Sequence, residues 1–165
     1  MKKTLYLMRH GQTLFNLQHK IQGWCDAPLT PLGIKQAQMA KEYFVNNQIT
    51  LDHAYASTSE RASDTLEIIT NMPYTRLKGL KEWNFGAFEG KDECLNPPFP
   101  YLDYFKQFGG ECELELRERM NKTLTEIMNK NDHQVVLAVS HGAACAQFYR
   151  AWEEHAKVKK TERFY

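Results

Sequence analysis

The chain has 165 residues, 42% of them hydrophobic and 25% charged, which is typical of one globular domain. Its 21 basic and 20 acidic side chains nearly cancel, so the charge predicts neither a nucleic-acid nor a membrane partner. No apolar run approaches the roughly 20 residues of a membrane span, and the N-terminus does not resemble a signal peptide. The four cysteines lack metal-binding spacing. We expect a cytoplasmic protein with free thiols, no metal and no cofactor.

The first predicted element is a strand that ends in nitrogen-rich side chains. Leu5 to Met8 is a run of apolar residues that predicts a buried strand, and Arg9, His10 and Gly11 follow it. In an open α/β sheet, ligands bind just outside the carboxyl ends of the strands. This stretch therefore indicates a functional site, although a capping arginine and a surface histidine are an equal interpretation of these residues alone.

Helices and strands alternate along the rest of the chain. In order, we predict a loop over 14–25, a helix over 31–47, a short strand over 51–56, a helix from 60, a weak strand over 75–80, turns over 81–90, an irregular aromatic stretch over 96–110 with one short helix, a helix over 113–130, a strand over 135–139 and a last helix from 143. This alternation predicts an α/β fold, a three-layer α/β/α sandwich with a mostly parallel central sheet.

Two helices have clear sequence signals. Thr30 and Pro31 are a typical N-cap and first helical residue. The expected buried face of that helix is formed by Ile34, Ala37, Ala40 (or Met39), Tyr43 and Phe44. In the helix over 113–130, the helical spacing of apolar residues predicts a buried face of Leu116, Met120, Leu124 and Ile127.

The strongest strand repeats the pattern of the first, because Val135 to Val139 is followed by Ser140, His141 and Gly142. If the two strands are neighbours, His10 and His141 project into one pocket. Arg61, in the first turn of a helix that follows a strand, would come from the same edge. A basic residue there opposes the helix dipole, which suggests a bound anion. Arginines and histidines together predict a phosphate site. A metal held by both histidines and a carboxylate is the alternative, which two arginines disfavour.

The residues at this edge carry a family resemblance. The chain resembles the histidine phosphatase superfamily, also called the phosphoglycerate mutase-like family, over nearly its whole length. The matching pieces, in family order, are Leu7-Met8-Arg9-His10-Gly11-Gln12-Thr13 with Asn16, Gly23-Trp24 with Asp26 and Pro28-Leu29-Thr30 to Gly33, Ser57 with Arg61-Ala62 and Thr65, Leu80-Lys81-Glu82 with Phe85-Gly86, Phe88-Glu89-Gly90, and Val139-Ser140-His141-Gly142.

The resemblance implies a role for each site residue. His10 resembles the nucleophile that forms a phosphohistidine, with its other ring nitrogen on a backbone carbonyl. Arg9, Arg61 and His141 resemble the clamp on the phosphoryl oxygens. Glu82 resembles the general acid and base, and Trp83 and Phe85 are expected to give it dry surroundings. The expected substrate-binding set adds Gly11, Asn16, Gln22, Gly23, Gly142 and the backbone N–H groups after Gly11. His19, His53, His133 and His155 are expected to be surface or packing residues.

The segment between Glu82 and His141 bears on the reaction. Related mutases carry a longer insertion there, rich in arginine and lysine, whereas residues 88–115 hold only Lys91 and Lys106 and a larger number of acids. We therefore expect a phosphomonoester hydrolase for a small phosphorylated metabolite, and the resemblance implies that residues 83–112 form a cover over the site. Its aromatic residues fit packing and a substrate-facing lid equally. A cofactor-dependent phosphoglycerate mutase and a non-catalytic phosphate-binding module are the alternatives.

Two further expectations concern the C-terminus of the chain and its assembly. Relatives usually continue past the last helix into a further strand, whereas this sequence reads from Ala151 to Tyr165 and stops. We therefore expect one domain over residues 1–165 with a C-terminal edge that could be incomplete. A homodimer is compatible with this sequence.

Overall fold

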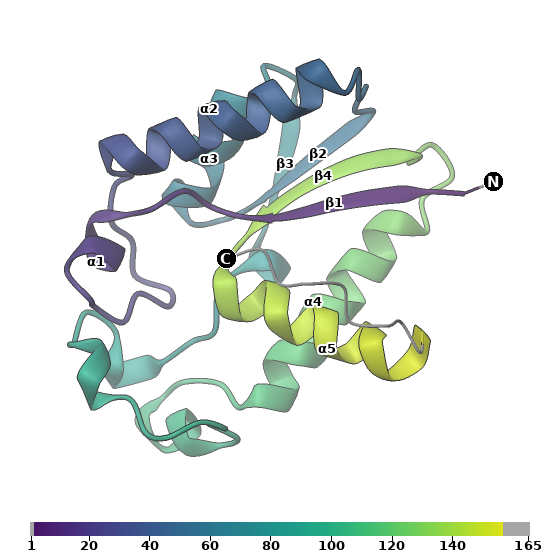
Figure 1. Cartoon of the computed structure of the whole chain (residues 1–165). Helices are drawn as coiled ribbons and strands as arrows, with labels where there is room; N and C mark the ends of the chain where they lie inside the picture. Colours follow the sequence, from purple (N-terminus) through teal and green to yellow (C-terminus); the bar gives the residue numbers. More distant parts are fainter. Residues whose placement is uncertain (1, 157–165) are drawn as a thin grey trace.

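The computed structural model describes residues 2–156, with side chains through residue 153, and its centre is a four-stranded parallel sheet (Figure 1). The strands lie in the order β1-β4-β2-β3, and every neighbouring pair is parallel. The elements are β1 (Thr4–Arg9), α1 (Leu14–Leu17), α2 (Pro31–Asn46), β2 (His53–Ser57), α3 (Glu60–Ile69), β3 (Tyr74–Leu77), four 3₁₀ turns η1 (Lys78–Leu80), η2 (Gly86–Phe88), η3 (Glu93–Leu95) and η4 (Tyr104–Phe108), then α4 (Glu113–Met128), β4 (Val135–Ser140) and α5 (Gly142–Ala156).

Helices cover both faces of this sheet, which confirms the predicted three-layer sandwich. Figure 1 shows α2 and α3 on one side of the strands and α4 and α5 on the other. Because successive side chains of a strand point to opposite faces, each strand serves two cores. In β4, Val136 and Ala138 pack with the α4 side chains, whereas Leu137 and Val139 pack with those of α3.

The first strand differs from its prediction. Within the described residues β1 pairs with β4 alone, so it lies at an edge of the sheet. None of its side chains is fully buried, whereas Val136 to Ser140 of β4 are. The apolar run therefore indicated a strand correctly but not its burial, because burial is set by the place of the strand in the sheet.

The helices follow their local signals closely at the ends and less closely on their faces. Thr30 caps α2 and accepts the N–H of Gly33 at 3.1 Å, as expected. Of the predicted α2 face, Ala37 and Phe44 are buried, but Ile34 and Tyr43 are about half exposed. All four predicted core residues of α4 are buried, including Leu116 and Met120.

Some connecting segments were also mispredicted. The expected loop over 14–25 begins with α1, which Thr13 and Asn16 close with reciprocal N-terminal hydrogen bonds. The weak strand over 75–80 stops at Leu77 and continues as η1. No helix among residues 2–156 has the length and hydropathy needed to cross a bilayer. The expected C-terminal edge falls on residues 157–165, outside the described part, as does the side chain of His155.

Candidate active site

The two histidines leave the sheet side by side. In the β1–β4 pair, Arg9 is opposite Ser140, and the His10 N–H donates to the Ser140 carbonyl at 3.0 Å. The rings of His10 and His141 meet edge to face, with centroids 5.2 Å apart. The sequence predicted one pocket for both imidazoles on the condition that the two strands are neighbours. The strands are neighbours, and both imidazoles lie together at the carboxyl edge of the sheet.

The His10 ring is held in one orientation by hydrogen bonds to both nitrogens. Nδ1 lies 2.7 Å from the Gly11 carbonyl oxygen, so it carries the proton and donates. Nε2 accepts the Nε–H of Arg61 at 3.1 Å. Burial lowers the pKa of His10 to about 3, and the positive charges of Arg61 and Arg9 add to this effect. His10 is therefore a neutral imidazole whose Nε2 lone pair points away from its backbone.

Arg61 is buried, and most of its donors are already bound to acceptors of the chain. Its guanidinium donates to the carbonyls of Gly23 and Cys25 at 2.8 and 3.0 Å and forms an ion pair with Asp26 at 2.9 Å. Asp26 also accepts the N–H of Glu60 at the start of α3. The sequence indicated a bound anion near this helix terminus, whereas the structure places the Asp26 carboxylate of the chain itself there.

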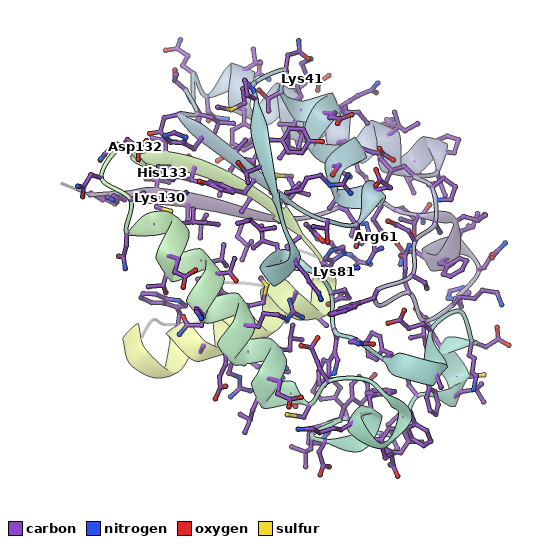
Figure 2. All side chains as sticks on the ribbon, turned by 180° about the vertical axis from the view of Figure 1, so that it is seen from behind. Lys41, Arg61, Lys81, Lys130, Asp132 and His133 are labelled. Carbon is purple, nitrogen blue, oxygen red and sulfur yellow. The ribbon has the colours of Figure 1, made fainter. Side chains whose placement is uncertain are left out.

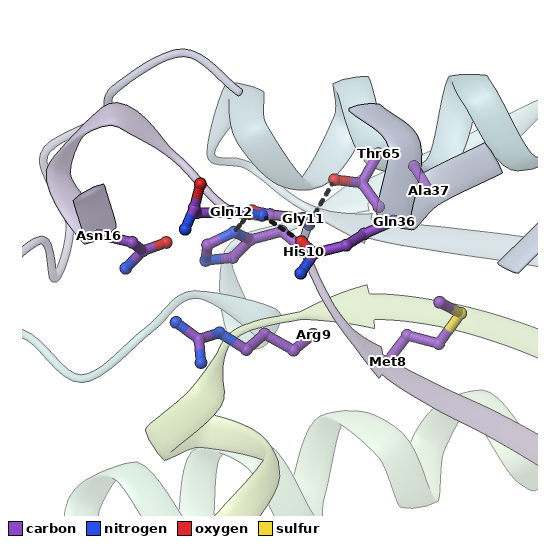
Figure 3. A pocket seen from close by; sticks show the side chains of 9 residues that line it. All are labelled: Met8, Arg9, His10, Gly11, Gln12, Asn16, Gln36, Ala37 and Thr65. Carbon is purple, nitrogen blue, oxygen red and sulfur yellow. Dashed lines mark hydrogen bonds between the residues drawn. The ribbon is translucent and has the colours of Figure 1, made fainter. Parts of the chain in front are cut away.

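Arg9 is the unpaired cation of the site. It is exposed, and no hydrogen bond or ion pair joins its guanidinium to another residue between 2 and 156. Figure 3 shows Arg9 and Asn16 pointing toward the same side of the His10 ring. Gln22 lies nearby with a buried Nε2 that has no partner among the described residues. These groups are free to bind anionic oxygens.

His141 lies beneath the pocket. It is 0% exposed, and neither ring nitrogen has a hydrogen-bond partner in the described part of the chain. Burial lowers the pKa of His141 well below that of a free histidine, and the charge of Arg61 acts in the same direction. Both ring nitrogens of His141 therefore keep their capacity to form a hydrogen bond.

Glu82 is anchored at the N-terminus of α5. Its Oε2 accepts the Ala143 N–H at 3.0 Å, and its Oε1 accepts the N–H groups of Ala144 and Trp83, both at 2.8 Å. The expected dry surroundings are therefore largely polar. The Trp83 ring turns away into an aromatic cluster and donates its Nε1–H to the Glu111 carbonyl.

One pocket of about 300 Å³ gathers most of the predicted residues. It is lined by Arg9, His10, Asn16, Gln22, Gly23, Arg61, Glu82 and Gly142. Gly11 lines an adjoining pocket (Figure 3). The expected N–H groups after Gly11 are engaged elsewhere, because those of Gln12 and Thr13 donate to Gln36 and Asn16.

The sequence reasoning missed several residues at this site. Lys20, Glu93 and Asn96 also line the pocket, and the Oδ1 of Asn96 is buried without a partner among residues 2–156. Glu89 holds the loop before Asp26 by accepting the N–H groups of Trp24 and Cys25. Glu89 belongs to the Phe88-Glu89-Gly90 motif, so the sequence held a signal for it. No motif marked Lys20, Glu93 or Asn96.

The aromatic residues of the cover form a small core of their own. Phe105 is fully buried against Trp83, Phe85 and Phe88. Of this aromatic cluster only Phe85 lines the pocket. The packing interpretation of the 96–110 stretch therefore fits better than a substrate-facing lid.

One group of metal-ligating side chains lies elsewhere. Within the described residues, His53, Asp132 and His133 form the one set of three with ligand atoms all within 4.8 Å, and Figure 2 shows Asp132 and His133 far from Arg61. The two imidazoles stack face to face, with centroids 3.6 Å apart and planes 13° apart. Two parallel rings cannot both direct a nitrogen lone pair at one ion. This geometry fits packing histidines bridged by a carboxylate.

Comparison with known proteins identifies the family of this chain. The fold is a parallel α/β sandwich with two histidines and two arginines at one edge of its sheet. Residues 5–165 match the family described as "Histidine phosphatase superfamily (branch 1)", and the chain belongs to that superfamily.

Relatives include both phosphatases and mutases. "Putative phosphoserine phosphatase 2" of Hydrogenobacter thermophilus is 31% identical over 160 residues, covering 85% of this chain and 73% of that protein. "Probable phosphoglycerate mutase GpmB" of Yersinia pestis is 32% identical over 154 residues, covering 85% and 70%. A crystal structure of phosphoserine phosphatase with 3-phosphoglyceric acid from Entamoeba histolytica is 31% identical, with a TM-score of 0.76 over 91% of this chain and 79% of that one.

Proposed function

We propose that this protein is a phosphomonoester hydrolase that acts on a small phosphorylated metabolite through a phosphohistidine on His10. The observation that carries the proposal is the state of His10: a neutral ring with Nδ1–H on the Gly11 carbonyl and an Nε2 lone pair in a pocket with Arg9, Arg61 and Glu82. A nucleophilic imidazole needs that protonation state and that tautomer. Phosphoserine phosphatases among the relatives support the substrate class.

The first half-reaction follows from this arrangement. The Nε2 lone pair forms a bond to phosphorus while the bond from phosphorus to the ester oxygen breaks, and protonated Glu82 gives its proton to that oxygen. For this to occur, the Arg61 Nε–H exchanges His10 Nε2 for a phosphoryl oxygen. Arg9, Asn16 and the buried His141 supply further contacts to the transferring group.

The second half-reaction restores the enzyme. Ionised Glu82 takes a proton from water, the water oxygen bonds to phosphorus, and the bond to Nε2 breaks to release phosphate. Residues 83–112 act as the cover, contributing Phe85, Glu93 and Asn96 to the pocket wall.

The pocket wall favours hydrolysis over mutase chemistry. The part contributed by residues 83–112 includes no cation, and Lys20 is already 3.5 Å from the Asp92 carboxylate. A mutase must hold an acidic substrate through transfer in both directions and exclude water meanwhile. The GpmB relatives support the mutase as the second candidate.

The test is hydrolysis of p-nitrophenyl phosphate by wild type, His10→Ala and the control His19→Ala, whose ring is 85% exposed. We expect activity in wild type and the control and none in His10→Ala. Equal turnover by all three, or none by wild type, contradicts the proposal. In a second assay, 3-phosphoglycerate with a trace of bisphosphate should release phosphate faster than it isomerises, and the reverse order would favour the mutase.

A further inference from the structure

Four consecutive backbone carbonyls lead to Glu82, and side chains bind all of them. Arg119 Nη1 donates to the carbonyls of Gly79 and Lys81, both at 2.9 Å, and its Nη2 donates to that of Glu82 at 3.1 Å. Ser140 Oγ donates to the Leu80 carbonyl at 2.7 Å. This segment lies outside the sheet, so its carbonyls depend on side chains for hydrogen bonds. Arg119 of α4 donates to three of these four carbonyls, and the Glu82 carbonyl also accepts the Trp24 Nε1–H at 2.8 Å.

Arg119 is itself oriented by an acidic side chain. Its Nε and Nη2 donate to the two carboxylate oxygens of Glu111, at 3.1 and 2.7 Å. Both side chains are largely buried, 20% and 14% exposed. A forked guanidinium on a carboxylate has a fixed direction, which a lysine could not reproduce.

The same pair also holds the backbone after Glu82. Glu111 Oε2 accepts the Asn84 N–H at 3.0 Å, and the Glu111 carbonyl accepts the Trp83 Nε1–H at 2.7 Å. Arg119 and Glu111 thus fix residues on both sides of Glu82. Neither lines the pocket, so neither can contact a substrate there.

We propose that Arg119, oriented by Glu111, is a positioning residue for proton transfer by Glu82. This inference rests on the proposed hydrolase function. With the backbone over 79–84 held in place, the Glu82 carboxylate reaches both the N-terminus of α5 and the pocket. Displacement of a reacting group by about 1 Å can cost about 100-fold in rate. Without the arginine contacts, the carboxyl loses its alignment with the departing oxygen while His10 is unaffected.

A neighbouring arginine offers a matched control. Arg117 lies on the same helix with similar exposure, 22%, and also forms an ion pair, to Glu113 at 2.9 Å. It also donates to Gln147, and within the described part of the chain it forms no hydrogen bond or ion pair with residues 79–84. Arg117→Gln therefore removes a comparable buried ion pair from α4 without touching the Glu82 segment.

The experiment compares p-nitrophenyl phosphate with phenyl phosphate, which differ mainly in how strongly the departing oxygen needs a proton. The measured quantity is kcat/KM, because it reports the steps up to departure of the leaving group and excludes hydrolysis of the shared intermediate. For Arg119→Gln we expect a loss of about 10- to 100-fold with phenyl phosphate and little loss with p-nitrophenyl phosphate. Arg117→Gln should lower kcat/KM equally for the two substrates or leave both values unchanged.

Two further variants keep the test decisive. For Glu111→Gln we expect a smaller loss of kcat/KM, again with phenyl phosphate and little with p-nitrophenyl phosphate. This variant replaces Arg119→Gln in the experiment if Arg119→Gln does not fold. Glu82→Gln should itself lose kcat/KM selectively with phenyl phosphate, and adding Arg119→Gln to it should cause no further selective loss. Equal losses for both substrates, or a selective loss that adds fully to that of Glu82→Gln, would overturn the proposal. Wild type that hydrolyses neither ester would instead refute the hydrolase function, and this inference with it.

Discussion

The Nε–H of Arg61 donates to Nε2 of His10 across 3.1 Å, so the arginine occupies the lone pair that the proposed reaction uses. A protonated imidazole could not accept this bond. The contact, the burial of both side chains and the lowered pKa of His10 are therefore three aspects of one arrangement. A phosphoryl group entering the pocket would replace His10 as the acceptor for Arg61.

This arrangement predicts a loss of stability in acid. An unfolded chain binds a proton on His10 with an ordinary pKa of 6.5, whereas the folded chain binds it only near 3. Between these values the unfolded state holds more protons, so the free energy of unfolding falls as pH falls, by up to about 1.4 kcal/mol per pH unit for this group. Urea unfolding at pH 7, 6 and 5 should show a smaller decrease for His10→Asn than for wild type. Parallel pH dependences would contradict the neutral buried state.

The ion pair behind Arg61 should matter for rate as well as for stability. Asp26→Asn keeps the shape of the side chain but removes the charge that balances a fully buried guanidinium. We expect the free energy of unfolding to fall by about 1–3 kcal/mol and kcat/KM for p-nitrophenyl phosphate by about 10-fold. Asp64→Asn, exposed on α3, is the control. An unchanged kcat/KM would show that Asp26 does not align Arg61.

Helix α2 shows which structural features can be predicted from a few adjacent residues. Thr30 and Pro31 predicted the start of the helix because capping depends on a few adjacent residues. The exposure of Tyr43 depends on which strand lies beneath it, and β1 at the sheet edge leaves that side partly open. Local signals are therefore dependable, whereas burial requires the strand order.

Two glycines set how closely the His10 loop approaches α2. A Cβ on Gly33 would collide with the Gln12 backbone, and one on Gly11 would collide with the Gly33 backbone. Alanine in a helix normally stabilises by about 1 kcal/mol relative to glycine. We expect Gly33→Ala to destabilise instead and to lower activity, because the loop must move. A thermal melt measures the sign, and a raised melting temperature would contradict this packing.

Lys20 should influence which leaving groups are preferred. It is the one lysine that lines the pocket within the described residues, and it is half-buried beside Asp92. For Lys20→Gln we expect kcat/KM to fall about 3- to 5-fold for a phosphomonoester bearing a carboxylate, such as phosphoserine, and to stay constant for phosphoethanolamine. Lys91→Gln, outside the pocket lining, should change neither. Equal losses for both esters would exclude a role in selectivity.

For the candidate site, the sequence indicated which residues would lie together but not the partners that hold them. His10, Arg61, Glu82 and His141 come together as the sequence indicated, because parallel strands end at one edge. Asp26 belonged to a matching motif but had no role assigned to it, and Arg119 gave no signal. Each is a charged residue in a loop or on an amphipathic helix, and only the folded chain places it against its buried counterpart.

The most direct test is to look for the covalent intermediate. Wild-type protein is mixed with excess p-nitrophenyl phosphate, quenched in alkali, where phosphohistidine survives, and digested for mass spectrometry. The account predicts a burst of p-nitrophenolate equal to the enzyme concentration and a phosphoryl group on the peptide that contains His10. A phosphoryl group on another residue, or steady hydrolysis that Glu82→Gln slows without any trapped phosphopeptide, would contradict it.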